Sequence, residues 1–434
     1  MPAFPRAERR PRRLRLRRPR RRQRGLSLKA LASSGTIRAL TGLRGYAALW
    51  VVLSHVSFTD SLSHPLAARL EWGRGEGVIR HEYLAVDLFF ILSGFVLTHA
   101  HARELDLGVD RRGYVRFLLL RLARVYPLHL IALVLAASIG LVVPNYLDNT
   151  VGTFVLHLLL MASWGFAKGL SWNGPAWSLS SEWLAYLALP PMILLSAGLR
   201  RLRGQLTALG LLILLFGGLF FGFLYSMTLL FELDISNGAG ANARVLISVA
   251  LGCVLRRLYD QERVRALPWT ALFWVSLPIA VLTMTDVSGR RLDNNLWAYL
   301  ATMFIVFAAA CASPRGLLPL TGRVPVYLGE ISFAIYIFHY PVLCVLRWTV
   351  GTRLDAMAEH ATVTEARLVI VAALAVVMGV AVVAHHLVEK PARRLARRWI
   401  DRRYPVTLVA RADATSAPAA AGDPAEGVGA AVGE

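Results

Sequence analysis

Long apolar stretches alternate along the chain with short polar connections, many of which are rich in arginine. A helix that crosses a membrane needs about 20 consecutive, mostly apolar residues. Stretches of this kind begin near ten positions: Leu40, Leu84, Phe117, Trp177, Leu206, Ala243, Pro268, Leu296, Tyr327 and Leu368. The pattern therefore predicts an all-α polytopic membrane protein with about ten transmembrane helices.

The distribution of Lys and Arg predicts how these helices are oriented. If both termini are cytoplasmic, the strongly basic connections around residues 103–116, 200–203, 256–265 and 315–323 all fall on the cytoplasmic side. The opposite side is sparse, apart from three arginines between residues 59 and 83. An eleventh apolar segment, residues 150–164, would reverse the later loops if it crossed. We therefore expect it to be re-entrant or interfacial.

Composition supports a membrane protein and divides the chain into three parts. Of 434 residues, 56% are hydrophobic and only 17% are charged. The net charge of +21 comes largely from arginine clusters that flank the spans, which suits anionic lipid head groups better than nucleic acid. We expect residues 1–37 to be an Arg-rich disordered cytoplasmic leader and residues 38–394 to form the membrane domain. Residues 395–434 form a basic and then Ala/Gly/Pro-rich tail, which we also expect to be disordered and cytoplasmic.

Arg44 and His55 are the first ionisable residues inside an apolar stretch. Eleven positions separate them, which puts them on one face of a helix, about three turns or roughly 16 Å apart. Arg44 could reach the cytoplasmic interface and His55 could cap the outer end, as in many membrane helices. Ionisable groups at membrane depth also mark functional sites, so both readings stay open here.

Other spans add polar residues that could join this pair. The second holds Asp87 near its outer end, where it could partner His55, and Ser93 in its middle. The third carries Arg121 and Arg124 on one face near the cytoplasmic boundary. These arginines could anchor lipid phosphates, or together with Arg44 they could bind a phosphorylated ligand.

Two later spans also contain ionisable side chains. Glu182 and Tyr186 share a face near the start of one, and Glu182 needs an Arg or His partner if it is away from water. His339 precedes Pro341 in another, where a lone histidine is commonly structural. The three cysteines are far apart, and no metal-binding, P-loop or nucleophile-elbow motif is present. We therefore expect no metal site.

Taken in order, the motifs TGLRGYAALWVVLSH, VDLFFILSGFVLT, RLARVYP, WSLSSEWLAY, YLGEISFAIYIFHYPV and HHLVEKP resemble the acyltransferase-3 family of integral membrane O-acyltransferases. The resemblance covers about residues 38–394 and implies ten spans. It also implies a location in the bacterial plasma (inner) membrane. This chain resembles the family's stand-alone members, which lack an appended hydrolase-like domain. Their acceptors include surface polysaccharides, lipo-oligosaccharide signals and macrolide sugars.

The resemblance implies transfer of an acyl group, usually acetyl from cytoplasmic acetyl-CoA, to a hydroxyl of a glycan or glycosylated metabolite. By position, Arg44 and His55 match the family's essential pair, and Arg121 and Arg124 match its Arg-x-x-Arg motif. Glu182 and His339 match motif positions whose roles are less settled, and Ser93, Trp177, Tyr186 and His339 are candidate pocket residues.

The chemistry of acyl transfer suits these residues. A neutral His55 could act as general base on the acceptor hydroxyl, with Asp87 or Glu182 fixing its tautomer, while the three arginines hold CoA phosphates. His55 could instead form an acyl-histidine that relays the group across the membrane. A secondary transporter for an anionic substrate is the rival from another class, although the chain shows no internal repeat. An exporter or scaffold gives no reason for the motif clustering.

Overall fold

The computed structural model describes residues 37–58, 72, 75–106, 110–140, 149–199, 201–228, 237–285, 291–358 and 360–405. All regular secondary structure within these ranges is helical, which confirms the predicted all-α class. The expected leader, except for residue 37, and residues 406–434 of the expected tail lie outside the described residues.

Each of the ten predicted spans corresponds to a helix. These are α2 (Arg38–Phe58), α5 (Tyr83–Asp106), α6 (Arg111–Gly140), α8 (Trp177–Ala197), α9 (Leu202–Thr228), α10 (Gly238–Tyr259), α12 (Trp269–Met284), α13 (Arg291–Cys311), α15 (Arg323–Ala358) and α16 (Val363–Ala384). Within the described residues, six helices are long and apolar enough to cross a membrane, namely α5, α6, α9, α10, α15 and α16 with its continuation. Ten crossings therefore stays a prediction.

Shorter helices connect or extend these elements. They are α4 (Gly75–Arg80), α7 (Val151–Leu158), η1 (Gly174–Ala176), α11 (Glu262–Arg265), η2 (Pro314–Leu317), α14 (Leu318–Thr321), η3 (His385–Glu389) and α17 (Lys390–Arg403). The predicted re-entrant segment contains only the eight-residue helix α7, which is too short to span a bilayer. Its depth in the membrane stays a prediction.

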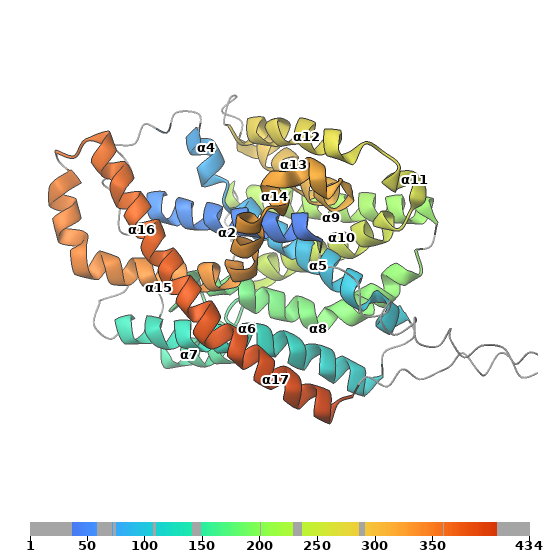
Figure 1. Ribbon diagram of the computed structural model, residues 1–434, viewed down its shortest axis with the longest axis horizontal. Coiled ribbons are helices and arrows are strands. Elements are labelled where there is room, and N and C mark those ends of the chain that lie inside the picture. The colour runs from blue at the N-terminus through green and yellow to red at the C-terminus, as the bar shows by residue number, and fades with distance from the viewer. Residues whose placement is uncertain are drawn as a thin grey trace, which may run out of the picture.

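Helix α2 lies in the middle of the molecule, between two groups of packed helices (Figure 1). Ala47 and Val51 belong to one hydrophobic cluster, with residues from α5, α8, α10 and α13. Ala48 and Val52, one position further along, belong to a second cluster with residues from α6, α15 and α16. Because α2 is apolar on both of these sides, it joins the two halves of the core.

Glycines let the central helices approach closely. A Cβ atom at Gly329 of α15 would lie 1.8 Å from the Thr41 carbonyl oxygen of α2, so no larger residue fits there. In the same way, Gly94 of α5 and Gly252 of α10 bring these two helices together. Small residues at helix contacts are typical of membrane bundles, in which close van der Waals packing replaces the hydrophobic effect.

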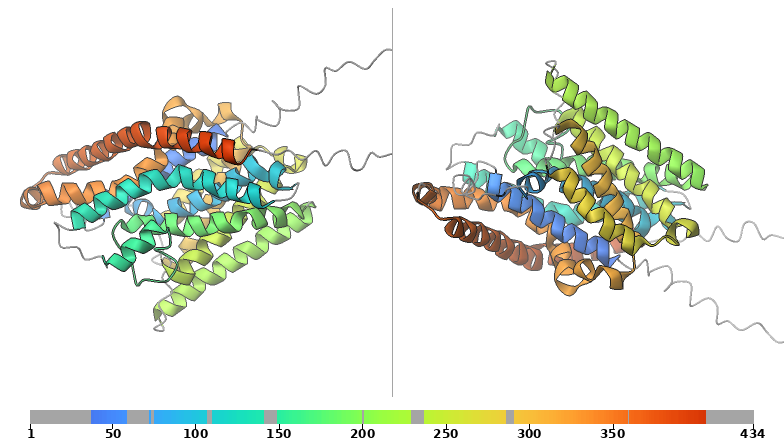
Figure 2. Two further views of the ribbon diagram at one scale, coloured as in Figure 1. Left: turned by 90° about the horizontal axis from the view of Figure 1, so that it is seen from below. Right: turned by 90° about the horizontal axis from the view of Figure 1, so that it is seen from above.

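Helices α16 and α17 form one long arm along the outside of the molecule (Figure 2). The five-residue π-helix η3 joins them, and α17 packs against α6. The basic start of the expected disordered tail is thus helical as far as Arg403. The Arg38 end of α2 and the Arg403 end of α17 reach the same end of the molecule as α11 (Figure 1).

Candidate active site

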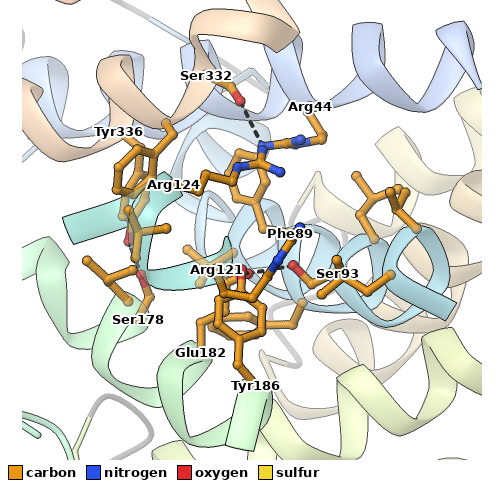
Figure 3. A pocket seen from close by; sticks show the side chains of 18 residues that line it. Arg44, Phe89, Ser93, Arg121, Arg124, Ser178, Glu182, Tyr186, Ser332 and Tyr336 are labelled. Carbon is orange, nitrogen blue, oxygen red and sulfur yellow. Dashed lines mark hydrogen bonds between the residues drawn. The ribbon is translucent and has the colours of Figure 1, made fainter. Parts of the chain in front are cut away.

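A pocket lies between α2, α5, α6, α8 and α15, and it has about 780 Å³ of space between atoms, including part that opens to solvent (Figure 3). Its wall collects six of the residues singled out from the sequence: Arg44, Ser93, Arg121, Arg124, Glu182 and Tyr186. Phe89 and Phe333 are among the apolar residues that complete it. Side chains from helices distant in sequence thus meet at one concave site.

Arg44 enters this pocket from α2 (Figure 3). Its Nη2 donates a hydrogen bond to the Ser332 hydroxyl of α15 at 3.3 Å. The Ser332 hydroxyl in turn donates to the Gly329 carbonyl oxygen at 2.9 Å. No ion pair of Arg44 is found among the described residues. A guanidinium that could make five hydrogen bonds therefore keeps most of that capacity for other partners.

Glu182 of α8 is held by two hydroxyl groups at the opposite wall. Its carboxylate accepts a hydrogen bond from the Ser93 hydroxyl at 2.5 Å and another from the Tyr186 hydroxyl at 2.7 Å (Figure 3). We expected a direct Arg or His partner, and in the described residues the hydrogen-bond partners are instead these hydroxyls. With three arginines and one carboxylate on its wall, the pocket suits an anionic ligand.

Arg121 and Arg124 come from successive turns of α6, as their spacing predicts. The Arg121 guanidinium lies 5.8 Å from the centre of the Phe117 ring. Its Nε is buried and makes no hydrogen bond in the described structure. A buried donor without a partner is costly, so this nitrogen is a candidate contact for a ligand oxygen.

His55 lies outside the pocket, since it is not among the lining residues. Its Nδ1 is 2.9 Å from the Val51 carbonyl oxygen, one turn earlier in α2. A carbonyl oxygen only accepts hydrogen bonds, so Nδ1 carries the proton and Nε2 the lone pair in the neutral ring. The contact that favours this tautomer is made by a backbone carbonyl, whereas we expected it from Asp87 or Glu182.

The ring of His339 packs edge-on against the ring of His55, with 4.8 Å between their centres. Its Nδ1 donates to the Tyr336 carbonyl oxygen at 2.5 Å, which leaves the lone pair on Nε2. That Nε2 is buried and has no hydrogen-bond partner in the described structure. His339 therefore lies deep in α15 as the neighbour of His55, which the sequence alone did not indicate.

Asp87 does not pair with His55. Both of its carboxylate oxygens accept hydrogen bonds from Arg244 of α10, at 2.8 Å each, and both side chains are buried. The Arg244 guanidinium also lies 5.8 Å from the centre of the Trp177 ring, and Trp177 does not line the pocket. Asp87 thus belongs to a buried ion pair between α5 and α10, beside which the Trp177 ring of α8 lies, and the prediction of an Asp87–His55 contact was wrong.

Two pocket residues on α15, Ser332 and Tyr336, were missed in the sequence. They are four positions apart, and His339 follows three positions later on the same face; His339 was already a candidate, but it does not line the pocket. The Tyr336 hydroxyl lies 2.8 Å from the Ser178 hydroxyl and 3.0 Å from the Pro175 carbonyl oxygen. The helical spacing could have identified this face. Arg244, an arginine inside an apolar span, carried the same signal as Arg44.

A second histidine pair lies apart from this pocket, where α6 meets α7. The His129 Nε2 donates to the His157 carbonyl oxygen at 2.9 Å, and the His157 Nε2 is 3.1 Å from the Ser171 hydroxyl. Burial, together with the neighbouring His129, lowers the pKa of His157 to about 4. His157 is therefore neutral at physiological pH, and its contacts tie α7 to the bundle.

Comparison with known proteins shows which family the sequence matches. The model of the acyltransferase-3 family, described as an acyltransferase domain, matches residues 37–386. Acyltransferase MdmB of Streptomyces mycarofaciens is 28% identical over 85% of this chain and 93% of its own length.

Two further relatives align less completely. The putative peptidoglycan O-acetyltransferase YrhL of Bacillus subtilis is 23% identical over 85% of this chain and 56% of its own length. A Rhizobium radiobacter protein named protein 2 in the picA locus is 37% identical over 33% of this chain and 75% of its own length. No solved structure matches the chain.

Proposed function

Because the chain belongs to the acyltransferase-3 family and is an acyltransferase, we propose that it transfers an acetyl group from cytoplasmic acetyl-CoA to a hydroxyl of a glycan or glycosylated metabolite. One observation carries this proposal. The face of α2 and α15 that presents Arg44 and Ser332 to the pocket continues, about two to three turns further, to His55 and His339. An anion-binding end and a candidate base thus lie along the same pair of helices.

Arg44, Arg121 and Arg124 bind the donor in this proposal. Acetyl-CoA carries its phosphates at one end and its thioester at the other, joined by an uncharged flexible arm. Guanidinium groups bind phosphate oxygens in a fixed, forked geometry. The excess of arginine over carboxylate on the pocket wall supports this role.

His55 activates the acceptor. Its Nε2 removes the proton of the acceptor hydroxyl as the oxygen attacks the thioester carbonyl carbon, so that a C–O bond forms and the C–S bond breaks. The CoA thiolate leaves and takes the proton back from the imidazolium, which returns His55 to its neutral form. General-base catalysis of this kind contributes roughly 10²- to 10⁴-fold to the rate. The hydrogen bond from Nδ1 to Val51 supports the required tautomer.

Glu182 and His339 support this chemistry without removing the proton themselves. The carboxylate of Glu182 holds the hydroxyls of Ser93 and Tyr186 and offsets part of the arginine charge. The unpartnered Nε2 of His339 lies in the ring that contacts His55, where it can stabilise the imidazolium. The buried Asp87–Arg244 pair has a structural role.

Carbohydrate is the acceptor class that we favour. YrhL is named as a putative peptidoglycan O-acetyltransferase, and it aligns over most of this chain. We place the protein in the bacterial plasma membrane with both termini cytoplasmic, an orientation that the distribution of basic connections favours.

Two measurements test the proposal. Purified protein in lipid should release free CoA from acetyl-CoA, and the release should quicken when a hydroxylated sugar acceptor is added. In cells, deletion of the gene should remove one acetyl group from a surface glycan or a secreted glycoside, as seen by mass spectrometry. A wild-type protein that neither hydrolyses nor transfers from acetyl-CoA would refute the donor assignment.

A further inference from the structure

A second cavity adjoins the pocket at the end of the molecule where α6 and α17 meet, and it has about 1410 Å³ of space between atoms, part of it open to solvent. Seven of its lining residues are basic: from α6 Arg116, Arg121 and Arg124, and from α17 Lys390, Arg393, Arg394 and Arg397. In the part of the chain that the structure describes, no acidic residue lines it. We call this cavity the basic vestibule.

The α17 residues of the vestibule form a single stripe. Their spacing of three, one and three positions places them on one side of a helix. Leu395 and Trp399 are exposed on the opposite side, where an apolar surface suits the bilayer interface. The basic stripe therefore lies on the opposite side of α17 from the apolar residues that suit contact with lipid.

One ion pair links α17 to α6, and another joins the start of α17 to η3. Arg116 forms an ion pair with Asp401 at 2.5 Å and donates to the Tyr404 carbonyl oxygen at 3.1 Å. At the other end, the buried Glu389 accepts hydrogen bonds from His385 at 2.7 Å and from Arg393 at 3.3 Å. The stripe is thus held in place before any ligand binds, which lowers the entropic cost of binding one.

Two arginines connect the vestibule to the pocket, because Arg121 and Arg124 line both cavities. The unpartnered Nε of Arg121 lies at this junction. Positive charge therefore continues from the solvent-facing stripe on α17, past Arg121 and Arg124, to Arg44. The vestibule lining is mostly basic, whereas the pocket lining is mostly apolar. A ligand with phosphates at one end and an uncharged arm at the other matches this change from a basic to an apolar lining.

We propose that the basic vestibule binds the phosphorylated nucleotide end of the acyl-CoA, with Lys390 and Arg394 of α17 as contacts for its phosphates. This inference rests on the proposed function, since it presumes an acyl-CoA donor. Phosphate groups of anionic lipids share the same chemistry, and the experiment below separates the two sources. The α17 helix, which reads in the sequence as a basic flank of the last span, thereby becomes part of the donor site.

The test compares two double variants that remove equal charge from α17. Lys390→Gln/Arg394→Gln changes the stripe at two residues with no ion pair in the described structure. Arg398→Gln/Arg402→Gln changes exposed residues of the same helix outside the vestibule. Each protein is purified into vesicles of phosphatidylcholine alone or with phosphatidylglycerol. Turnover is measured with acetyl-CoA and with S-acetyl-pantetheine, which lacks the nucleotide.

We expect the stripe variant to raise the KM for acetyl-CoA about tenfold, because two charge-assisted phosphate contacts are lost. Its turnover of S-acetyl-pantetheine should match that of the wild type, and the Arg398→Gln/Arg402→Gln control should keep the wild-type KM. Adenosine 3′,5′-bisphosphate should raise the melting temperature of the wild type and of the control but not of the stripe variant.

Equal KM values for acetyl-CoA in the two variants would overturn the assignment of the vestibule. So would a defect that affects both donors equally and appears only in vesicles with phosphatidylglycerol, because that result indicates a lipid site. If the wild type turned over no acetyl-CoA, the proposed function would fail. Stripe-dependent stabilisation by the bisphosphate would then still support a nucleotide-phosphate site.

Discussion

Two arginines inside apolar helices have opposite surroundings. Arg244 is bound through two hydrogen bonds by Asp87, and both side chains are shielded from solvent. Arg44 makes one hydrogen bond to a neutral hydroxyl in the described structure and lines a pocket. A buried arginine with a complete partner is structural, whereas one with spare donors at a cavity is suited to binding an anion.

This contrast predicts different effects on stability. Asp87→Asn should lower the free energy of unfolding by about 3 kcal/mol or more, because Arg244 is left as an uncompensated buried charge. Glu76→Gln, which breaks the exposed pair of Glu76 with Arg80, should cost less than about 1 kcal/mol. Denaturation of both variants in the same lipid or detergent measures the difference. Equal losses would contradict a structural role for the Asp87–Arg244 pair.

Arg44→Gln should leave the fold intact and weaken donor binding. We expect the KM for acetyl-CoA to rise at least about tenfold, since a charged hydrogen bond to phosphate is worth roughly 1.5–3 kcal/mol. Steady-state kinetics on the purified variant measures this, with the melting temperature as the check on folding. An unchanged KM would place the donor phosphates away from Arg44.

At the scale of elements, the parallel contact of α2 and α15 positions the candidate site. The contact depends on glycines, since a side chain at Gly329 would overlap the α2 backbone at Thr41. Arg44 meets Ser332 and His55 meets His339 along this one contact. A change in the distance between α2 and α15 would therefore alter the Arg44–Ser332 contact and the His55–His339 contact together.

Gly329→Ala tests this dependence. We expect it to destabilise the protein by about 1–3 kcal/mol and to reduce acyl transfer, because the methyl group forces the helices apart. Gly379→Ala in α16 is the matched control, since a Cβ there meets nothing within 4 Å. The control should be neutral or stabilise by up to about 1 kcal/mol. Thermal unfolding measures the stability of both variants. Equal melting temperatures for Gly329→Ala and Gly379→Ala would contradict the proposed role of Gly329 in packing.

The sequence predicts what depends on local pattern. Hydrophobic runs identified the helices, and helical spacing put Arg121 beside Arg124 and Glu182 beside Tyr186, as the structure has them. The partner of Asp87 was missed because pairing between helices depends on how the bundle packs, which the period of one helix does not encode. The vestibule was missed for the same reason, since α17 is separated from α6 by more than 200 positions.

At the scale of the whole molecule, the basic vestibule and His55 lie at different distances from one end of the bundle. The basic vestibule lies at the end where the Arg38 end of α2 and the Arg403 end of α17 are found, and His55 lies further along α2 (Figure 1). This arrangement fits a donor that enters from the cytoplasm and reaches toward the outer half of the membrane.

Labelling of single cysteines tests this orientation. In a background without the three native cysteines, Arg398→Cys should react with a membrane-impermeant maleimide only in inside-out vesicles. Phe166→Cys, an exposed position in the loop after α7, should react only from the outside of intact cells. Labelling of both positions from the same side would contradict the proposed topology.

The most direct test of the account is the rate of acetyl transfer by His55→Gln in lipid, compared with the wild type. His129→Gln, which changes a buried histidine away from the pocket, serves as the control. We predict that His55→Gln slows transfer by about 100-fold or more while its melting temperature and its binding of adenosine 3′,5′-bisphosphate stay at wild-type values. Transfer at the wild-type rate by a folded His55→Gln protein would contradict the central claim that His55 is the general base.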